Sequence, residues 1–393
     1  NLFDAYGVKP SNVHAPADLQ SFPVLEKHHV QDNLKQLVAK KICMGDLVLD
    51  RTGGSTGAPI EYYFSKKRTR SIMAATWRHN GFVDWHIGDK TAILWGASRD
   101  IPKVTMKRRL RNLLIDRNMF FNTAGFQPNE MIEFDKQLKR FRPKVIQAYA
   151  NSIGLFALYF RENGIRPFSP QAIVTSAEML TPENRELIEE TFSAPVFNRY
   201  GSREFGVIAS ECKQRDGLHI MQEGLYIEIM KEGRHLEKGE TGELIVTDLL
   251  NFAMPFIRYR IGDAACWKQG TCRCGRGLRR LSNIAGRTTD FLLGADGRLC
   301  SGAALTVALA AERPSLGQIQ LEQNEQNRII CRIAPKKGRV TVAEDKKYLV
   351  QKVRQYLGEK TLVDFEIVSR IEHEPSGKYR FSKSTLTNLF QVT

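Results

Sequence analysis

Short apolar runs alternate with helical stretches up to about residue 285, and this alternation most limits the folds that the chain can adopt. The runs at Lys90–Gly96, Lys144–Tyr149 and Ala172–Ser176 are bounded by glycine, proline or polar residues and are typical of buried strands. Helical patterns lie between or after them, at Ser152–Asn163 and Thr181–Thr191. Strands that alternate with helices predict a layered α/β domain.

The last of these helices has a clear start signal. Thr181 supplies an N-cap hydroxyl, Pro182 suits the first helical position, and Glu183 places a carboxylate in the first turn. We therefore expect the helix to begin directly after Thr181.

The pattern changes further along the chain. From Gly224 to Trp267, strands and turns predict a β-rich subdomain. After Ile284–Arg287, alternating apolar residues around a polar turn at Asn324–Asn327 predict a β-hairpin. A helix at Ala343–Leu357 and a strand at Leu362–Val368 complete a small α+β domain.

The length of 393 residues exceeds what one hydrophobic core usually supports. We predict a large domain over residues 1–285 and a small one over residues 286–393.

A hydrophobic share of 42% with 26% charged residues is ordinary for a soluble protein, and we find no apolar run long enough to span a membrane. The opening residues NLFDAYGVKPSN do not resemble a signal peptide. Seven unevenly spaced cysteines do not suggest a disulfide framework, so we expect a reducing, cytoplasmic setting.

A net charge of +15 leaves several kinds of partner open. Nucleic acid, an anionic membrane surface and a phosphorylated substrate all fit, and so does a surface that is simply basic. The densest cluster, Lys107–Arg111, lies where an amphipathic helix would turn Leu110, Leu113 and Leu114 inward. A solvated helix face is the favoured interpretation of this cluster, and contact with an acceptor or a membrane is the alternative.

A loop rich in glycine and hydroxyl residues is the strongest local motif. Glycines let successive backbone N–H groups converge on an anion, and hydroxyls add further donors. The loop is not a Walker motif, because Ala58 stands where lysine is required, and it lacks the spacing of a dinucleotide fingerprint. Its residues are Gly53, Gly54, Ser55, Thr56 and Gly57.

Four further motifs follow in the chain. Tyr200–Gly206 comes after a strand-like run and places an aromatic ring and a carboxylate where α/β sheets bind ligands. Arg258–Asp263 ends a strand in an acidic turn. Gly286–Asp290 lies at the predicted domain boundary, and Pro375–Arg380 places a lysine in a turn near the C-terminus. Each motif alone is weak evidence for a function, but five such motifs in this order are a specific pattern.

Together these motifs resemble the adenylate-forming (ANL) superfamily of acyl–CoA synthetases and related ligases. The similarity covers essentially the whole chain. It is strongest to the phenylacetate–CoA ligase-like proteins and their relatives in capsular polysaccharide biosynthesis (CapK-like). The segments that point to this branch are Asp18–Lys27, Ser210–Ile220, Leu249–Asp263 and Cys272–Gly277.

The resemblance implies a role for each motif. The loop Gly53–Gly57 would hold the β- and γ-phosphates of ATP. Glu204 would hold Mg²⁺, and Asp263 would accept hydrogen bonds from the ribose. Arg287 would contact ribose or phosphate at a hinge, and Lys378, on a mobile lid, would bridge the α-phosphate and the acid. The adenine side of the site would comprise Ser176, Ala177, Glu178, Tyr200, Gly201 and Ser202.

The implied reaction joins a carboxylate to the α-phosphate of ATP. Two anions repel each other, so catalysis consists mostly of positioning and charge neutralisation. The acyl-adenylate then passes its acyl group to a thiol, most commonly that of CoA. One alternative is transfer to an amine or hydroxyl of a polysaccharide precursor or carrier. Another is a nucleotide-binding protein without catalysis. No nucleic-acid-binding signature is present, and we expect a monomer or homodimer.

Cysteines and a histidine are spaced as a metal site could be. Cys212 and His219 lie seven residues apart, and Cys272 and Cys274 follow some fifty residues later. Such a set can complete a tetrahedral zinc site, although buried free thiols fit the spacing as well. Cys266 is a rival ligand. The resemblance favours one structural Zn²⁺ per chain.

The acid pocket is expected after the first long helix and beside Glu204. Phe82, Trp85 and Phe205 are its candidate walls. Aromatic walls would favour an aryl or another apolar acid.

Overall fold

In the computed structural model, the chain divides into two compact units. The first combines Asn1–His86 with Phe197–Ile284, and the second combines Ile87–Val196 with Ala285–Thr393. The sequence contains no signal for the boundaries between the units after residues 86 and 196. The predicted separate lid domain over residues 286–393 stays a prediction. The residues that the structure describes are 6–52, 60–95, 105–122, 128–237, 239–287, 291–295, 299–301, 316–335, 342–372 and 382–386, together with Phe3, Leu305 and Leu309.

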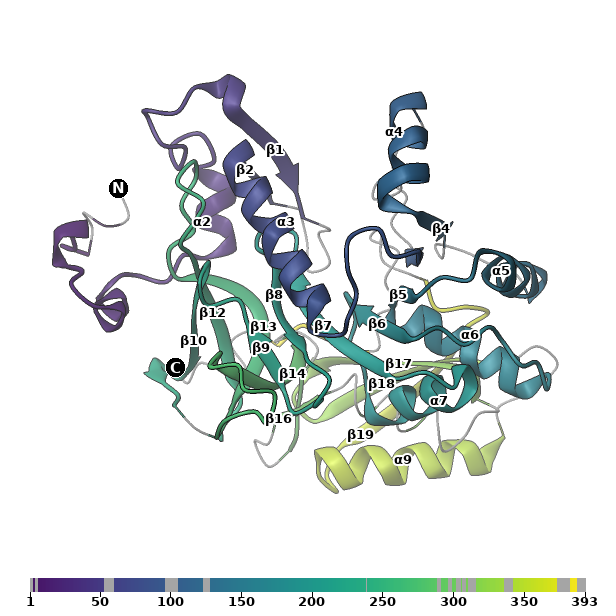
Figure 1. Cartoon of the computed structure of the whole chain (residues 1–393). Helices are drawn as coiled ribbons and strands as arrows, with labels where there is room; N and C mark the ends of the chain where they lie inside the picture. Colours follow the sequence, from purple (N-terminus) through teal and green to yellow (C-terminus); the bar gives the residue numbers. More distant parts are fainter. Residues whose placement is uncertain are drawn as a thin grey trace. The chain divides into compact units, whose positions relative to one another are not determined.

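The first unit is built on antiparallel strands. Eight neighbouring strands follow the order β11-β10-β12-β13-β14-β9-β8-β7 (Figure 1). The strand-rich stretch predicted from Gly224 to Trp267 supplies β10 to β13, which confirms that prediction. The bounds are β7 Val196–Ser202, β8 Gly206–Glu211, β9 Leu218–Ile220, β10 Leu225–Lys231, β11 Arg234–His235, β12 Gly242–Asp248, β13 Tyr259–Lys268 and β14 Arg280–Arg287.

A hairpin and a long helix belong to the same unit. Strands β1 (Leu47–Arg51) and β2 (Glu61–Ser65) pair antiparallel, and α3 (Lys66–Gly81) follows at once. The Ser65 hydroxyl accepts a hydrogen bond from the Arg68 backbone N–H at 3.1 Å, which caps the first turn of α3. The shorter elements are the 3₁₀ turns Pro10–Asn12, Pro16–Ser21 and Met44–Asp46 and the helix α2 Lys27–Asp32.

A buried ion pair connects α3 to the sheet. The Arg68 side chain is 1% exposed, and its Nε donates to Asp248 Oδ2 at 2.7 Å. Its Nη2 donates to the Phe205 carbonyl at 3.2 Å, in the turn between β7 and β8. Burial raises the pKa of Asp248, and the neighbouring guanidinium opposes that rise. One arginine therefore joins a helix, a strand end and a turn.

The second unit contains a parallel sheet in the order β6-β5-β3-β4. Its strands are β3 Thr91–Trp95, β4 Asn118–Asn122, β5 Val145–Tyr149 and β6 Ala172–Ser176. Three of them confirm strands predicted from the sequence. Every residue of β6 is buried, as is typical of parallel strands, which are covered on both faces.

The helices beside this sheet are α5 (Pro128–Phe141), α6 (Ala150–Glu162) and α7 (Pro182–Phe192). The predicted N-cap of α7 is confirmed, because the Thr181 hydroxyl accepts from the Asn184 N–H at 3.2 Å. The apolar core of this part is rich in aromatic rings, which include Phe134, Phe156, Phe160 and Phe192.

The C-terminal part has a hydrophobic core of its own. A four-stranded sheet runs in the order β19-β18-β17-β20, and α9 (Ala343–Leu357) has the predicted bounds. Leu349 and Val353 of α9 join the core formed by the predicted hairpin strands. The buried amide of Gln323 ties this sheet to the hairpin β15–β16 through two hydrogen bonds with the Leu293 backbone. The strands are β15 Phe291–Leu293, β16 Leu299–Ser301, β17 Gln318–Glu325, β18 Arg328–Ala334, β19 Leu362–Ile367 and β20 Ser382–Ser384.

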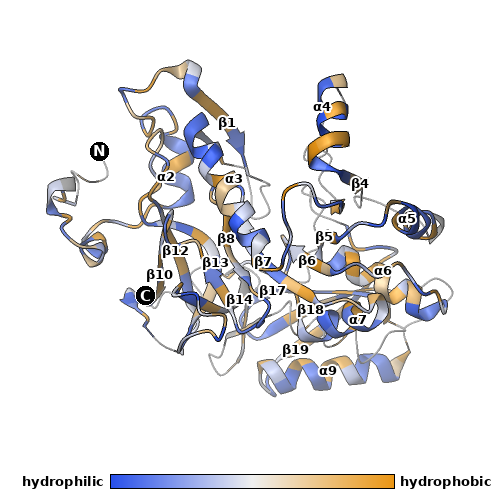
Figure 2. Ribbon diagram, viewed as in Figure 1, coloured by the Kyte–Doolittle hydropathy of each residue, from blue (hydrophilic) through white to orange (hydrophobic). Residues whose placement is uncertain are grey.

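The predicted inward turn of Leu110, Leu113 and Leu114 is wrong. These side chains are 57%, 73% and 67% exposed. Helix α4 (Met106–Arg111) spans only six residues, passes into a π-helical turn (Asn112–Asp116) and leads into β4 at the sheet edge. The segment extends past the strands of its own unit (Figure 2), so those strands do not cover its apolar side chains. None of the described helices combines the length and apolar character needed to span a membrane.

We predict that Arg68→Met lowers the free energy of unfolding by about 3–5 kcal/mol, because it leaves the Asp248 carboxylate buried without its counter-charge. Arg70→Met is the matched control, since Arg70 lies on the same helix with an exposed side chain. Chemical denaturation of the two variants measures the difference. Equal stability of both variants would show that the buried pair does not hold the unit together.

Candidate nucleotide site and cysteine–histidine cluster

Several predicted site residues lie outside the described part of the chain. The loop Gly53–Gly57 and Lys378 are among them. Arg287 ends β14, and its side chain is not among those that the structure describes. Their predicted roles stay predictions.

Two predicted nucleotide-binding side chains meet in the first unit. The Tyr200 hydroxyl donates a hydrogen bond to Asp263 Oδ2 at 2.6 Å. Tyr200 lies on β7 and Asp263 on β13, which are not neighbours in the sheet. Tyr200 is 9% exposed, and Asp263 is half-buried. The pair presents an aromatic ring beside a carboxylate, which suits a base and a ribose.

The turn after Tyr200 is held in place by close backbone contacts. A Cβ on Gly201 would lie 2.4 Å from the Gly206 carbonyl oxygen, so only glycine fits there. The Ser202 hydroxyl accepts from the Phe205 N–H at 3.3 Å, which closes the turn around Glu204. This arrangement positions the Glu204 carboxylate directly after β7.

Glu204 is half-buried and lies in an environment that keeps nearby phenols protonated. Burial raises the pKa of Tyr62 and of Tyr259, and the negative charge of Glu204 adds to both increases. A carboxylate so placed offers the oxygen ligands that Mg²⁺ prefers.

Phe205 packs in the core of the first unit. Its side chain is fully buried, with its ring centroid 5.8 Å from that of Phe256 and 6.0 Å from that of Tyr259. Its predicted role as a wall of the acid pocket stays a prediction.

The arginines of the Arg258–Asp263 motif bind the N-terminal segment. Arg258 is buried, pairs with Glu228 at 3.1 Å and donates to the Phe22 carbonyl. Arg260 pairs with Glu26 at 2.8 Å. These side chains support the strand that carries Asp263.

The predicted adenine loop Ser176–Glu178 belongs to the second unit. Ala177 follows β6 with φ +68°, a left-handed conformation that costs a non-glycine residue about 1–2 kcal/mol. Glu178 Oε2 accepts from the Asn151 N–H in the first turn of α6 at 2.8 Å, where the helix dipole favours a negative charge. Ser176 is buried. Backbone strain beside a strand end is a common property of ligand-binding loops.

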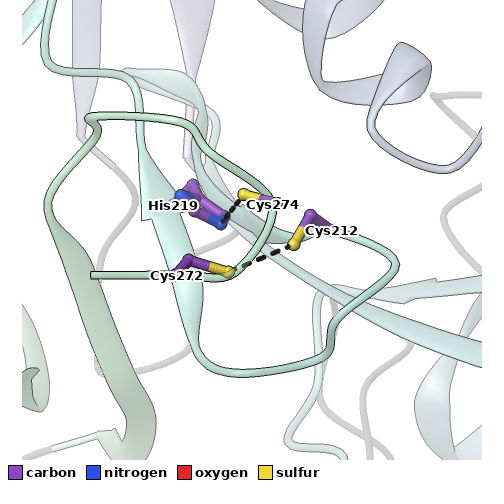
Figure 3. Close-up of side chains that lie close together, drawn as sticks. All are labelled: Cys212, His219, Cys272 and Cys274. Atoms are coloured by element: carbon purple, nitrogen blue, oxygen red, sulfur yellow. Dashed lines mark hydrogen bonds between the residues drawn. The ribbon is translucent and has the colours of Figure 1, made fainter. Parts of the chain in front are cut away.

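All four predicted metal ligands converge in the first unit (Figure 3). The sulfurs of Cys212 and Cys272 lie 3.7 Å apart, and the Cys274 sulfur lies 3.4 Å from His219 Nε2. Cys212 follows β8, His219 lies on β9, and the other two come from the loop between β13 and β14. Cys266, the rival ligand, is not one of the four grouped residues.

These separations match a tetrahedral zinc site. Zinc–sulfur bonds of about 2.3 Å and zinc–nitrogen bonds of about 2.0–2.1 Å place two sulfurs about 3.8 Å apart and a sulfur about 3.5 Å from a nitrogen. The Cys212–Cys272 separation is too long for a disulfide, and both thiols are free. The four ligand atoms all lie within 4.8 Å of one another.

The protonation states of the cluster also suit a metal. Burial lowers the pKa of His219 to about 4, so the ring is neutral at pH 7. Burial would raise the pKa of Cys274, but hydrogen bonds from Arg276 and the neighbouring cysteines lower it to about 7. Burial raises the pKa of Cys212 to about 11, so this thiol would need a cation to ionise.

Phe82 lies at this cluster. Its ring centroid is 5.8 Å from that of His219, and the Arg276 guanidinium stacks on it at 4.3 Å. The sequence analysis did not name Arg276 as a neighbour of the cluster, although the two arginines within Cys272–Gly277 were a signal. Trp85 is buried, with the Arg199 guanidinium 5.4 Å from its ring centroid. The acid-pocket roles of Phe82 and Trp85 stay predictions.

Comparison with known proteins gives consistent matches. The family model of the CapK C-terminal domain matches residues 292–385. Protein CapK of Staphylococcus aureus is 26% identical over 376 residues, which cover 93% of this chain and 80% of CapK. The phenylacetate–coenzyme A ligase of Escherichia coli is 27% identical, over 74% of this chain and 66% of the ligase.

The fold matches solved ligase structures. That of 2-hydroxyisobutyryl-CoA ligase, in the postadenylation state with R3-HIB-AMP, gives a TM-score of 0.77 at 19% identity and covers 98% of this chain and 84% of the ligase. The predicted α/β class is thereby confirmed. The family model, the relatives and the fold together support the adenylate-forming (ANL) superfamily. Within it, they support the branch of CapK and the phenylacetate–coenzyme A ligases, as the sequence motifs predicted.

We predict that Asp263→Asn weakens ATP binding by about 10–100-fold, because hydrogen bonds to a charged acceptor contribute about 1.5–3 kcal/mol. Tyr200→Phe should weaken binding less, by about 3–10-fold, since the ring remains and only one neutral donor is lost. Isothermal titration calorimetry with ATP measures both constants. Asp364→Asn, an exposed carboxylate on β19, is the control. Unchanged affinity in Asp263→Asn would remove this residue from the nucleotide site.

Proposed function

We propose that this chain is an ATP-dependent ligase that activates a carboxylic acid as an acyl-adenylate and transfers the acyl group to the thiol of coenzyme A. The observation that carries the proposal is the Tyr200–Asp263 pair beside Glu204. In this proposal Tyr200 would stack on the base, Asp263 would accept from the ribose, and Glu204 would supply a further carboxylate, all within one unit. The similarity to coenzyme A ligases supports the choice of acceptor.

The first step joins the acid to the nucleotide. A carboxylate oxygen of the acid attacks the α-phosphorus of ATP, and the bond to the β-phosphate oxygen breaks to release pyrophosphate. The loop Gly53–Gly57 would hold the leaving phosphates with backbone N–H groups. Lys378 would lie between the two anions and reduce their repulsion. Mg²⁺, held by Glu204, would neutralise phosphate charge when bound.

The second step transfers the acyl group. The thiol sulfur attacks the carbonyl carbon, the thiol proton is released, and AMP leaves with the electrons of the acyl–phosphate bond. Tyr200 and Asp263 would keep the AMP part in place through both steps. Arg287 would contact the ribose or phosphate as the residues after it reorient.

We further propose an aryl or other apolar acid as the substrate. The similarity to phenylacetate–coenzyme A ligases supports this choice. Apolar pockets bind such acids by excluding water from the ring.

We infer that Cys212, His219, Cys272 and Cys274 hold one structural Zn²⁺. Four protein ligands complete its coordination, which leaves no open position for catalysis. A bound ion would link the end of β8, β9 and the loop between β13 and β14.

The function is tested by pyrophosphate release with ATP over a panel of aryl and aliphatic carboxylic acids, each with and without coenzyme A. We expect release only with a suitable acid, and a thioester product only with coenzyme A. Lys378→Ala should reduce the adenylation rate by about 10²–10³-fold and leave ATP affinity within a few fold. Lys360→Ala, an exposed lysine, is the control. Absence of acid-dependent release would refute the proposal, and release without a thioester would indicate another acceptor.

The zinc inference predicts one zinc ion per chain after purification without chelators, measured by elemental analysis. Cys272→Ser should lose the metal and lower the unfolding temperature, because the ion contributes folding free energy. Cys43→Ser, which changes an exposed free cysteine, should keep both properties. A metal-free wild-type protein, or full zinc in Cys272→Ser, would contradict the inference.

A further inference from the structure

The segment from Met106 to Arg117 exposes apolar and basic side chains together. Met106, Leu110, Leu113 and Leu114 follow the spacing of one helical stripe and Ile115 lies outside it, yet all five face solvent. Their exposed fractions are 78% for Met106, 57% for Leu110, 73% for Leu113, 67% for Leu114 and 48% for Ile115. Isolated exposed apolar residues are ordinary on protein surfaces, but five within ten positions are not.

The same twelve residues carry five basic side chains and one acidic side chain. Asp116 pairs with Arg111 at 3.0 Å. Lys107, Arg108 and Arg109 are exposed, and no carboxylate of the described residues lies within ion-pair distance of them. The segment therefore combines an apolar surface with positive charge that no carboxylate of the described residues neutralises, apart from the Arg111–Asp116 pair.

We propose that the segment Met106–Arg117 binds the surface of a bilayer that contains anionic lipids. Leucine, methionine and isoleucine side chains would enter the boundary between head groups and acyl chains, while the lysine and arginine side chains would contact anionic head groups. The segment extends beyond the strands of its own unit, and Phe120 of β4 is 38% exposed next to it (Figure 1). An aromatic ring in that place suits a membrane interface.

Charge distinguishes a lipid surface from other partners. The segment carries five basic side chains against one acidic side chain. A protein partner would have to neutralise this charge with aspartate and glutamate, which are depleted at protein–protein interfaces, although arginine itself is enriched there. A nucleic acid would use the arginines but would leave the five apolar side chains in water. An anionic bilayer provides an apolar layer for the five apolar side chains and negative head groups for the basic side chains.

The test is co-sedimentation of the full chain with vesicles of phosphatidylcholine alone or mixed with phosphatidylglycerol. It needs neither ATP nor acid, so its outcome is independent of the ligase proposal. We expect binding to the mixed vesicles that weakens with salt. Arg108→Gln/Arg109→Gln should lower the affinity by about tenfold or more. Lys346→Gln/Lys347→Gln, two exposed lysines of α9, is the matched control for charge.

The variant Leu113→Gln/Leu114→Gln should bind the mixed vesicles about as weakly as Arg108→Gln/Arg109→Gln. The unfolding curve of this leucine variant should equal that of the wild type. Leu362→Gln/Ile367→Gln, at exposed positions of β19, is its matched control. Separately, the fluorescence of Leu114→Trp, after subtraction of the wild-type signal, should shift to the blue with mixed vesicles. Leu362→Trp should show no such shift.

Three results would overturn the proposal. The first is a wild-type chain that fails to bind mixed vesicles. The second is equal binding by the wild type and Leu113→Gln/Leu114→Gln. The third is self-association of the wild type, abolished by the same double substitution, with no lipid binding; that result would make the segment an interface between copies.

Discussion

The buried pair of Arg68 and Asp248 is the contact on which the candidate nucleotide site depends. Arg68 bonds both to the carboxylate that ends β12 and to the backbone carbonyl of Phe205. Asp248 also accepts hydrogen bonds from the N–H groups of Leu250 and Asn251, so both of its carboxylate oxygens have hydrogen-bond donors. Burying two charges is costly unless each finds such partners. Because Phe205 directly follows Glu204, the bonds that stabilise the ion pair also hold the turn that carries a site residue.

Tyr200, of the predicted nucleotide-binding pair, and two members of the cysteine–histidine cluster lie on or directly after neighbouring strands. Tyr200 lies on β7, Cys212 follows β8, and His219 lies on β9. The cluster joins β8 and β9 to the distant loop that holds Cys272 and Cys274. A metal there would cross-link β8 and β9 to that loop, beside the strand that carries Tyr200. A structural ion in this place would reduce strand motion near the site.

The segment Met106–Arg117 shows what an amphipathic pattern can and cannot predict. Its periodicity indicated a helix, and a helix is present. The inward orientation of its leucines was wrong, because a pattern states which side chains share a face and not what covers that face. In this chain α4 leads into the edge strand β4 and extends past the sheet. The same spacing in α9 packs Leu349 and Val353 into a core, because a sheet lies beside that helix.

The sequence by itself determined the strands β3, β5 and β6, the start of α7 directly after Thr181, both bounds of α9 and the similarity to the adenylate-forming superfamily. These features are local, since periodicity, capping hydroxyls and ordered motifs act over a few residues or are read in chain order. Tertiary structure alone decided that Tyr200 bonds to Asp263 sixty-three positions away, that Phe82 contacts the cysteine–histidine cluster, and that the leucines of Leu110–Leu114 face solvent. Those outcomes depend on which distant strand or layer lies alongside, and no local pattern encodes that.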